Sequence, residues 1–435
     1  MRTIFLLTLL AALGLAAGCG GMSTSSTTTT TTTTPTGSSS TGSNVLAITV
    51  NGGPAGNYQN GAFASATVCA PGSTSNCVTI DNLLVDTGST GLRVFDSEVS
   101  ALGLPAASAS NGSAAFDCVS FVDGSFLWGP VDQADVTLGS ETASSVPIQV
   151  ISSSATGVPS SCSNGSSENE NTAALLGANG ILGVGTEPTD CYLDGTSPCA
   201  PSSGLGTPPS PAYYTCSGSS SSTCTPAFVA KANQVTNPVV LFPTDNNGVI
   251  VELPSATSSE ASLSGSLIFG IGTESNNALP SGASIFTMSC GFFTTVFDGQ
   301  TFGVTNAATC AGAGSFIDSG SNGLFFQNVS NIPVCPSNSG LSSFYCPATT
   351  DSLSATMEGA NGTSKSVSFS VANAENIFSS ATTAADPVQP QVDGVEFAGS
   401  GFDWGLPFFY GVNVYNAIDG QSVPSGAPAA PWWAY

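Results

Sequence analysis

The chain has 435 residues, enough for two or three domains with sizeable buried cores, yet only 7% of them are charged. Four basic residues against 28 acidic ones give a formal net charge of -24. Because phosphate contacts need Lys and Arg, no nucleic-acid partner is expected. The absence of histidine removes Ser-His-Asp catalysis, Cys-His catalysis and histidine-ligated zinc. An enzyme built from this chain would have to use carboxylates, hydroxyls, a rare Lys or a cofactor. Carboxylates are abundant, and the acidic composition suits either low pH or an acidic secreted surface.

The N-terminus resembles a bacterial export signal. A positive start at Arg2 precedes an apolar run over residues 4–17, which is too short to span a bilayer but suits a signal-peptide core. The run ends in LAAGC, residues 15–19, which resembles the bacterial lipobox. This pattern predicts a signal peptide over residues 1–18 and lipidation of Cys19, with an ordinary cleaved signal peptide as the alternative.

Residues 19–45 are predicted to hold the lipidated cysteine and a tether. Residues 20–44 are almost entirely Gly, Ser and Thr, a composition that cannot bury a core and behaves as a flexible linker. No later stretch is long and apolar enough to cross a bilayer. The membrane is therefore expected to contact the protein only through the N-terminal lipid anchor.

From Asn44 onward, short apolar stretches alternate with turn residues, a pattern typical of an all-β protein. Helical periodicity is scarce and is clearest over residues 226–234. No repeat of about 20 to 50 residues is visible, which argues against a propeller or solenoid. The clearest predicted strands are Val45–Val50, Val78–Ile80, Leu83–Val85, Val146–Ile151 and Leu267–Phe269.

Cysteine usage indicates an oxidising compartment. The chain has 13 cysteines, and lipidation of Cys19 would leave an even number for disulfides. No CxxC pair occurs, and without histidine a zinc site is not expected. Proximity along the chain favours, without fixing the connectivity, the pairs Cys69–Cys77, Cys118–Cys162, Cys191–Cys199, Cys216–Cys224, Cys290–Cys310 and Cys335–Cys346.

Two similar segments in separate halves of the chain carry the candidate chemistry. Residues 83–94 read LLVDTGSTGLRV, and residues 315–326 read SFIDSGSNGLFF. In each, an apolar strand would deliver a carboxylate, Asp86 or Asp318, to a buried turn. The Gly permits close backbone approach, and the hydroxyl residues supply hydrogen bonds. One Asp-Thr-Gly alone would be interpreted as an ordinary turn, whereas two copies predict a pair of carboxylates brought together.

A close pair of carboxylates shares one proton, because like charges at short range do not both ionise. The ionised member can act as a base on a water molecule between them, while the protonated member donates to the substrate carbonyl. This chemistry hydrolyses peptide bonds without histidine, a metal ion or a nucleophilic side chain. It is one of the few hydrolytic mechanisms that the composition permits, and no cofactor is expected.

The first motif resembles that of the pepsin-like aspartic proteases, commonly DTGSSxLWV. The chain is also similar to an uncharacterised bacterial family of secreted lipoproteins related to these proteases. Further segments in the family's order are SFVDGS at 120–125 and VDQADVTLG at 131–139, which are similar to the flap and the following strand, NGILGVG at 179–185, LIFG at 267–270 and DWGLPFF at 403–409. The resemblance covers most of residues 46–420. It implies an all-β, bilobal fold with β-rich lobes over 46–245 and 246–435 and a cleft between them.

Carried over by position, the resemblance makes Asp86 and Asp318 the catalytic dyad. The residue after each Asp would contribute to a buried hydroxyl pair linking the two lobes. The first serine after each motif glycine would hydrogen-bond and orient the carboxylate. The residues that support the dyad would be Thr87, Gly88, Ser89, Ser319, Gly320 and Ser321.

Three positions depart from the family pattern. The flap position that usually holds Tyr is Phe121, in a predicted flap and cleft segment that includes Asp123 and Gly124. The Trp of the first motif is Arg93, and the second motif lacks the hydroxyl and apolar residues usual after its serine. Since the Tyr and Trp that the family has at these two positions normally interact, the flap is expected to be rebuilt. Arg93 either binds an acidic substrate group or nearby carboxylate, or is a surface or structural residue paired within the fold.

These patterns predict a monomeric, exported aspartic endopeptidase that cleaves an extended peptide or protein substrate at acidic pH. It would be lipid-anchored in the bacterial cell envelope, facing the periplasm or the cell surface, with Gly20 after the lipid cysteine favouring the outer membrane. The alternative is a catalytically inactive, protease-like envelope lipoprotein that binds peptide, glycan or a protein partner, favoured by Phe121 and Arg93. A structural or adhesive surface protein is a third hypothesis, and fold alone does not decide among the three.

Overall fold

The computed structural model of the protein describes residues 42–121, 124–154, 157–163, 166, 168–190, 212–218, 223–307, 312, 314–380, 388–389, 393–396 and 401–435. Strands provide most of the regular structure in these residues, which confirms the all-β fold class. The described helices are α1 (Asp96–Val99), α2 (Ser160–Ser163), α3 (Ala173–Leu176) and α4 (Ala374–Ser380), with 3₁₀ turns at Ser100–Leu102, Lys231–Asn233, Pro238–Leu241 and Leu406–Phe409.

The strands fall into an earlier and a later group along the chain. The earlier strands are β1 (Val45–Asn51), β2 (Gly61–Cys69), β3 (Cys77–Asp86), β4 (Thr90–Phe95), β5 (Phe116–Ser120), β6 (Phe126–Leu138), β7 (Glu141–Ile151), β8 (Gly180–Val184), β9 (Ala212–Cys216) and β10 (Cys224–Pro226). The later strands are β11 (Gly248–Glu252), β12 (Leu263–Phe269), β13 (Ile285–Thr287), β14 (Thr294–Phe297), β15 (Gln300–Phe302), β16 (Ser315–Ile317), β17 (Leu324–Phe326), β18 (Asp351–Glu358), β19 (Ser364–Val371), β20 (Asp393–Glu396), β21 (Phe402–Trp404), β22 (Asn413–Ala417) and β23 (Trp432–Ala434).

The strands predicted from the apolar stretches are confirmed. Two of those stretches belong to one strand, β3, which continues through both. The helix expected over residues 226–234 is wrong, because only the 3₁₀ turn Lys231–Asn233 forms there. Val229 and Val235, on either side of this turn, are both buried in an apolar cluster with residues of other elements. Burial of these two side chains in extended chain outweighs the weak helical pattern.

Six strands of the largest sheet close into a mixed barrel. Their order is β6-β7-β4-β8-β3-β2, and β2 pairs back onto β6. The long strand β6 makes this closure possible, since its first half pairs with β5 and its last residues with β2. A register shift after Ala134 marks an irregularity where β6 runs along β7.

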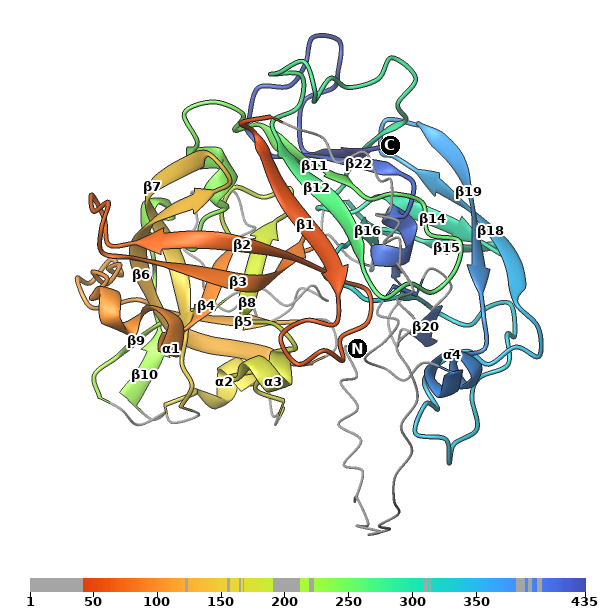
Figure 1. The fold of residues 1–435 in the computed structure, drawn as a ribbon, viewed down its shortest axis with the longest axis horizontal. Coiled ribbons are helices and arrows are strands. Elements are labelled where there is room, and N and C mark those ends of the chain that lie inside the picture. The colour runs from red at the N-terminus through yellow and green to blue at the C-terminus, as the bar shows by residue number, and fades with distance from the viewer. Residues whose placement is uncertain are drawn as a thin grey trace, which may run out of the picture.

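The rest of the described chain extends from the barrel through β1. This strand pairs with β2 on one side and β12 on the other, and the sheet continues in the order β12-β11-β22-β23-β13. Two four-stranded sheets, β15-β14-β18-β19 and β16-β21-β17-β20, complete the fold. Figure 1 shows the barrel on the left, the smaller sheets on the right, and β1, β11, β12 and β22 between them.

Two three-stranded units share one arrangement. In the first, β8 lies between β3 and β4, parallel to β3 and antiparallel to β4. In the second, β21 lies between β16 and β17, parallel to β16 and antiparallel to β17. Each unit therefore carries one Asp-hydroxyl-Gly motif in the connection between its two outer strands, with a third strand inserted between them.

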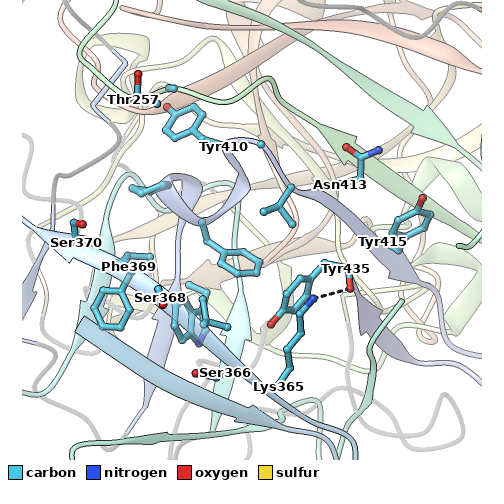
Figure 2. Close-up of a pocket in the computed structure, with 18 of the residues that line it drawn as sticks. Thr257, Lys365, Ser366, Ser368, Phe369, Ser370, Tyr410, Asn413, Tyr415 and Tyr435 are labelled. Carbon is cyan, nitrogen blue, oxygen red and sulfur yellow. Dashed lines mark hydrogen bonds between the residues drawn. The ribbon is translucent and has the colours of Figure 1, made fainter. Parts of the chain in front are cut away.

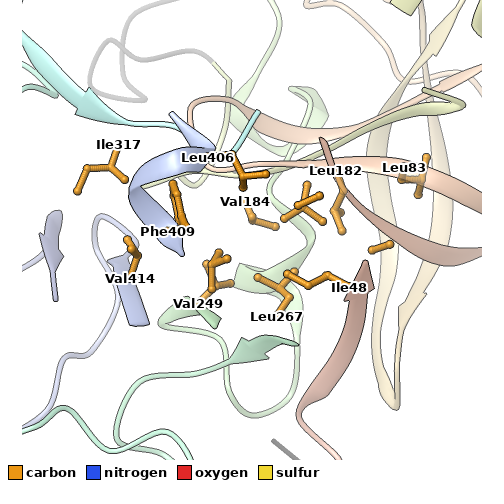
Figure 3. Close-up of a cluster of buried hydrophobic side chains, with 14 of the residues drawn as sticks. Ile48, Leu83, Leu182, Val184, Val249, Leu267, Ile317, Leu406, Phe409 and Val414 are labelled. Carbon is orange, nitrogen blue, oxygen red and sulfur yellow. The ribbon is translucent and has the colours of Figure 1, made fainter. Parts of the chain in front are cut away.

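One apolar cluster connects the two units. Along β1, Leu46, Ile48 and Val50 are buried while the alternate residues are more exposed, as expected for a strand with one face on the core. Figure 3 shows the cluster running from Ile48 through residues of β8, β11 and β12 to Ile317. Each large apolar side chain buried in this way contributes roughly 1.5–3 kcal/mol to stability relative to exposure. The cluster thus gives both motifs a rigid base.

Four of the predicted disulfides are present: Cys69–Cys77, Cys118–Cys162, Cys216–Cys224 and Cys335–Cys346. They indicate an oxidising, extracytoplasmic compartment. Cys290 is also disulfide-bonded, but Cys310 and the predicted pair Cys191–Cys199 lie outside the described residues. The described helices include none with the length and apolar character needed to cross a bilayer.

Candidate active site

The first motif holds Asp86 at the end of β3. Its side chain is buried, with 2% of its surface exposed. The backbone N–H of Gly88 donates to Oδ1 at 2.8 Å, and the hydroxyl of Ser89 donates to Oδ2 at 2.6 Å. Both oxygens are therefore fixed by donors from the turn that immediately follows the strand, in the arrangement that the sequence predicts for Ser89.

The second motif holds Asp318 in the same way, directly after β16. The backbone N–H of Gly320 donates to Oδ1 at 2.7 Å, and the hydroxyl of Ser321 donates to Oδ2 at 2.8 Å. The side chain of Asp318 is partly exposed, in contrast to Asp86. Its backbone N–H donates to the carbonyl of Trp404 on the inserted strand β21 at 3.0 Å, which ties the motif to that strand.

Reciprocal hydrogen bonds between Thr87 and Ser319 join the two motifs. Thr87 Oγ1 donates to the carbonyl of Ile317 at 3.0 Å and accepts from the backbone N–H of Ser319 at 2.9 Å. Ser319 Oγ donates to the carbonyl of Val85 at 2.7 Å and accepts from the backbone N–H of Thr87 at 3.1 Å. Both side chains are buried, so each motif satisfies the backbone of the other.

Gly88 brings the two carboxyl groups close together. A Cβ atom at this position would lie 2.5 Å from Cγ of Asp318 and 2.8 Å from each of its carboxyl oxygens. The same glycine donates its N–H to Asp86. The backbone that holds one carboxylate therefore contacts the other, and any side chain at residue 88 would collide with Asp318.

A third carboxyl group, which the sequence analysis did not assign to the site, reaches the second motif. Asp403 on β21 is 4% exposed, and its Oδ2 lies 2.6 Å from Ser321 Oγ. Burial raises the pKa of Asp403 well above its ordinary value, the charge of Asp318 raises it further, and the Ser321 hydrogen bond opposes the shift. The sequence feature that could have identified Asp403 is an acid in a segment that is apolar in the family that the sequence resembles.

Arg93 is a structural residue paired within the fold and does not lie on the surface. It is 1% exposed, and its guanidinium donates to Asp117, to Asp190 at 3.1 Å and to Gln149 at 2.7 Å. A longer bond of 3.4 Å reaches the carbonyl of Thr90. Although burial opposes the charged form, the two carboxylates outweigh it and raise the pKa of Arg93. Its contacts satisfy the protein itself, so this side chain is not available to an acidic substrate.

The Arg93 network holds two carboxyl groups against one cation. Burial raises the pKa of both Asp117 and Asp190, and Asp117 raises that of Asp190 further. Tyr213 donates its hydroxyl to Asp190 and accepts the backbone N–H of Val235 at 2.7 Å. The network therefore stabilises the excess acid with a phenol as well as with the guanidinium.

The predicted flap forms the connection between β5 and β6. The N–H of Phe121 donates to the carbonyl of Ser125 at 2.8 Å, and the N–H of Gly124 donates to the carbonyl of Phe121 at 3.0 Å. The ring of Phe121 is half-buried against an apolar cluster that includes Tyr58. Asp123, like the lipidation candidate Cys19, lies outside the described residues.

A separate cavity of about 700 Å³ lies beside β19, and neither motif aspartate is among its lining residues. Figure 2 shows Lys365 and Tyr435 at one side of it, where the Lys365 ammonium donates to the Tyr435 carbonyl at 3.3 Å and lies 3.9 Å from the centre of its ring. Trp404 and Phe408 form part of its apolar lining, and no Asp or Glu is among the lining residues. The cavity therefore lacks the acid-base groups that the motifs provide.

Among the described residues, no group of three or more potential ligands is arranged to hold a metal ion. The two motif carboxyl groups are fixed by four donors, and the two motifs are joined through reciprocal hydrogen bonds to each other's backbone. Residues 40–435 match a family model described as a protein of unknown function, DUF3443. No curated protein matches the chain.

Proposed function

The chain belongs to the DUF3443 family, and we propose that it is an aspartic endopeptidase in which Asp86 and Asp318 activate a water molecule for peptide hydrolysis. The observation that carries this proposal is the reciprocal bonding of Thr87 and Ser319, which sets two identically held carboxyl groups against each other. A structural turn requires one such motif. Two motifs that complete each other serve to position a carboxyl pair.

The proposed mechanism follows from the proton shared by a close carboxyl pair. One carboxylate takes a proton from the water molecule, and the other carboxyl group, which is protonated, donates to the substrate carbonyl as the tetrahedral intermediate forms. The first carboxyl group then protonates the amide nitrogen while the second takes a proton from a hydroxyl of the intermediate. The C–N bond breaks, and a carboxylic acid and an amine leave with the dyad restored. Ser89 and Ser321, with the two backbone N–H groups, keep the carboxyl planes fixed during this exchange. The substrate is expected to reach the pair from the side of Asp318, which is partly exposed, whereas Asp86 is buried.

The wider proposal is a bilobal, pepsin-like protein exported to the cell envelope and anchored through Cys19. The barrel with the first motif would form one lobe, and the later sheets with the second motif would form the other. The repeated three-stranded units support this proposal. Each unit has the same strand pairing and carries its motif in the connection between the two outer strands. The four disulfides support export.

Cleavage of a denatured protein mixture between about pH 2 and 8 tests the function. Asp86→Asn and Asp318→Asn are each expected to lower the cleavage rate by about 10²- to 10⁴-fold, because each removes one of the two acid-base groups. Asp81→Asn is the matched control, since Asp81 lies on the same strand as Asp86 but is exposed. Cleavage that survives in both dyad variants would contradict the proposal.

A binding protein with a protease-like fold is the second candidate, favoured by the flap. Phe121 carries no hydroxyl, and its ring packs against the protein itself. If the folded protein retains an extended peptide at all pH values without cutting it, and binding persists in both dyad variants, this second function replaces the first. Mass spectrometry of the recovered peptide distinguishes the two outcomes.

A further inference from the structure

Ser321 connects two carboxyl groups. Its Oγ lies 2.8 Å from Oδ2 of Asp318 and 2.6 Å from Oδ2 of Asp403. Asp403 comes from β21, the strand inserted between the two arms of the second motif, and this strand also accepts the backbone N–H of Asp318. The three side chains therefore form a continuous chain of hydrogen bonds that ends at the proposed dyad.

This chain requires two protons. A serine hydroxyl carries one hydrogen and donates once, so it cannot donate to both carboxyl groups at the same time. Since both oxygen–oxygen distances are within hydrogen-bonding range, a second hydrogen must come from one of the two acids. Either Asp403 donates to Ser321, which donates to Asp318, or the order is reversed.

The surroundings of the two acids decide the order. Asp403 is 4% exposed, lies opposite Phe316 and Phe325 on the neighbouring strands, and has no hydrogen-bond partner at Oδ1 among the described residues. Asp318 is partly exposed and also accepts the N–H of Gly320. A negative charge is therefore stabilised far better on Asp318 than on Asp403.

We propose that Asp403 is a protonated carboxylic acid whose hydroxyl donates to Ser321 and thereby directs the Ser321 hydrogen to Asp318. Asp403 is a positioning residue, because it acts through Ser321 and does not contact the reacting atoms. Its importance for catalysis rests on the proposed function of the dyad. The protonation of Asp403 does not depend on that function. The protonation and the role in catalysis are therefore tested by different measurements.

The charges around Asp403 agree with this order. Burial is the largest cause that raises its pKa, followed by the charge of Asp318, and the charge of Asp86 acts in the same direction. The hydrogen bond between Ser321 and Asp403 opposes this rise in pKa without reversing it. A neutral donor at the end of the chain strengthens the bond from Ser321 to Asp318, since successive hydrogen bonds polarise one another.

Infrared difference spectroscopy of the purified full chain tests the protonation. At about pH 5.5, where a solvent-exposed aspartate with a pKa of about 3.9 is almost fully ionised, the wild-type protein is expected to show a carboxylic acid band that Asp403→Asn lacks. Other protonated acids contribute equally to both spectra and cancel. In Ser321→Ala the same band is expected to shift, because the acid loses its acceptor.

Two results would overturn the proposal. One is a difference spectrum in which Asp403→Asn removes an ionised carboxylate band, since Asp403 would then be charged. The other is a carboxylic acid band that does not move in Ser321→Ala. If Asp403→Asn fails to fold, Asp403→Leu supplies the same comparison, because it removes the acid and leaves an apolar side chain between Phe316 and Phe325. None of these measurements requires proteolysis.

The pH profile of cleavage tests the positioning role. In Asp403→Leu, Ser321 loses its donor, so the acidic limb of the profile is expected to move to higher pH by up to about half a unit. Asp403→Asn retains a neutral donor and is expected to keep the wild-type limb. Equal pH profiles in the wild type and the Leu variant would show that Asp403 contributes only to packing. If the wild type does not cleave at all, the proposed function is refuted, but the infrared result on the protonation of Asp403 remains valid.

Discussion

The two three-stranded units have the same frame but bury different ionisable groups. In the first unit, Arg93 on β4 lies opposite Ile181 on β8. In the second unit, Phe325 on β17 lies opposite Asp403 on β21. These two pairs occupy corresponding positions in the two units. The first unit has its buried ionisable group, a cation, on the outer strand, whereas the second has an acid on the inserted strand.

Each unit compensates its buried group by a different means. Arg93 is fixed by two carboxylates and an amide, so its partners are built into the chain. Asp403 has one hydroxyl partner, and its burial favours the neutral form. A buried charge can therefore be stabilised by permanent partners built into the chain, as in the first unit, or removed by a proton, as in the second.

Removal of Arg93 is expected to have the largest effect on stability. Arg93→Met leaves Asp117 and Asp190 buried without their cation, and the loss of one partner of a buried ion pair costs about 3–5 kcal/mol. The free energy of unfolding, measured in urea at neutral pH, reports this loss. Arg93→Lys is the matched control and should lose less, because it retains the charge but not the forked donor geometry.

A second substitution sharpens the same prediction. Asp117→Asn in the Arg93→Met background should recover part of the lost stability, because it removes one of the uncompensated acids. Arg93→Met should also be less destabilising near pH 4 than at neutral pH, since its two acids can then be neutral in both states. An Arg93→Met protein as stable as the wild type at neutral pH would contradict the pairing.

The sequence predicted much of this arrangement because its signals were local. The apolar stretches specify strands, and each Asp-hydroxyl-Gly turn contains the donors of its own carboxylate, as Gly88 and Ser89 do for Asp86. Repetition of the motif supplied the pairing of the two turns, which Thr87 and Ser319 make. Three disulfides between cysteines 8 to 11 residues apart were predictable for the same reason, while Cys118–Cys162 spans 44 residues.

The inserted strands and the buried charges were beyond this reasoning, because their partners are distant in sequence. Asp403 is 82 residues from the Ser321 that it contacts. Asp190 is 97 residues from Arg93, and their proximity depends on how β8 enters between β3 and β4. The sequence therefore left two interpretations of Arg93 open, and its packing selects the parts of them that concern nearby carboxylates and pairing within the fold.

Loss of the Thr87 hydroxyl, which links the two units, is expected to have the next largest effect on stability. Thr87→Val keeps the shape of the side chain but leaves the carbonyl of Ile317 and the N–H of Ser319 without their partner. Each buried group left unsatisfied costs about 1–3 kcal/mol. Urea unfolding measures the loss, and Thr87→Ser, which retains the hydroxyl, should retain most of the stability. Equal losses in Val and Ser variants would show that packing of the methyl group matters instead.

The smallest effect expected near pH 5, about one unit above the ordinary pKa of an aspartate, is a pH-dependent one at Asp403. Because its pKa in the folded state is raised, the native protein holds a proton that the unfolded chain releases above about pH 4. This contribution is fully present below that pH and falls by about 1.4 kcal/mol per pH unit as pH rises, until Asp403 ionises in the folded state. Asn carries no such proton. The free energy of unfolding of Asp403→Asn should therefore rise relative to that of the wild type as pH rises. If the free energies of unfolding of the two proteins ran parallel from about pH 4 to 7, Asp403 would ionise as readily in the folded protein as in the unfolded chain. The second unit would then need a partner for the charged Asp403, just as the first unit has partners for Arg93.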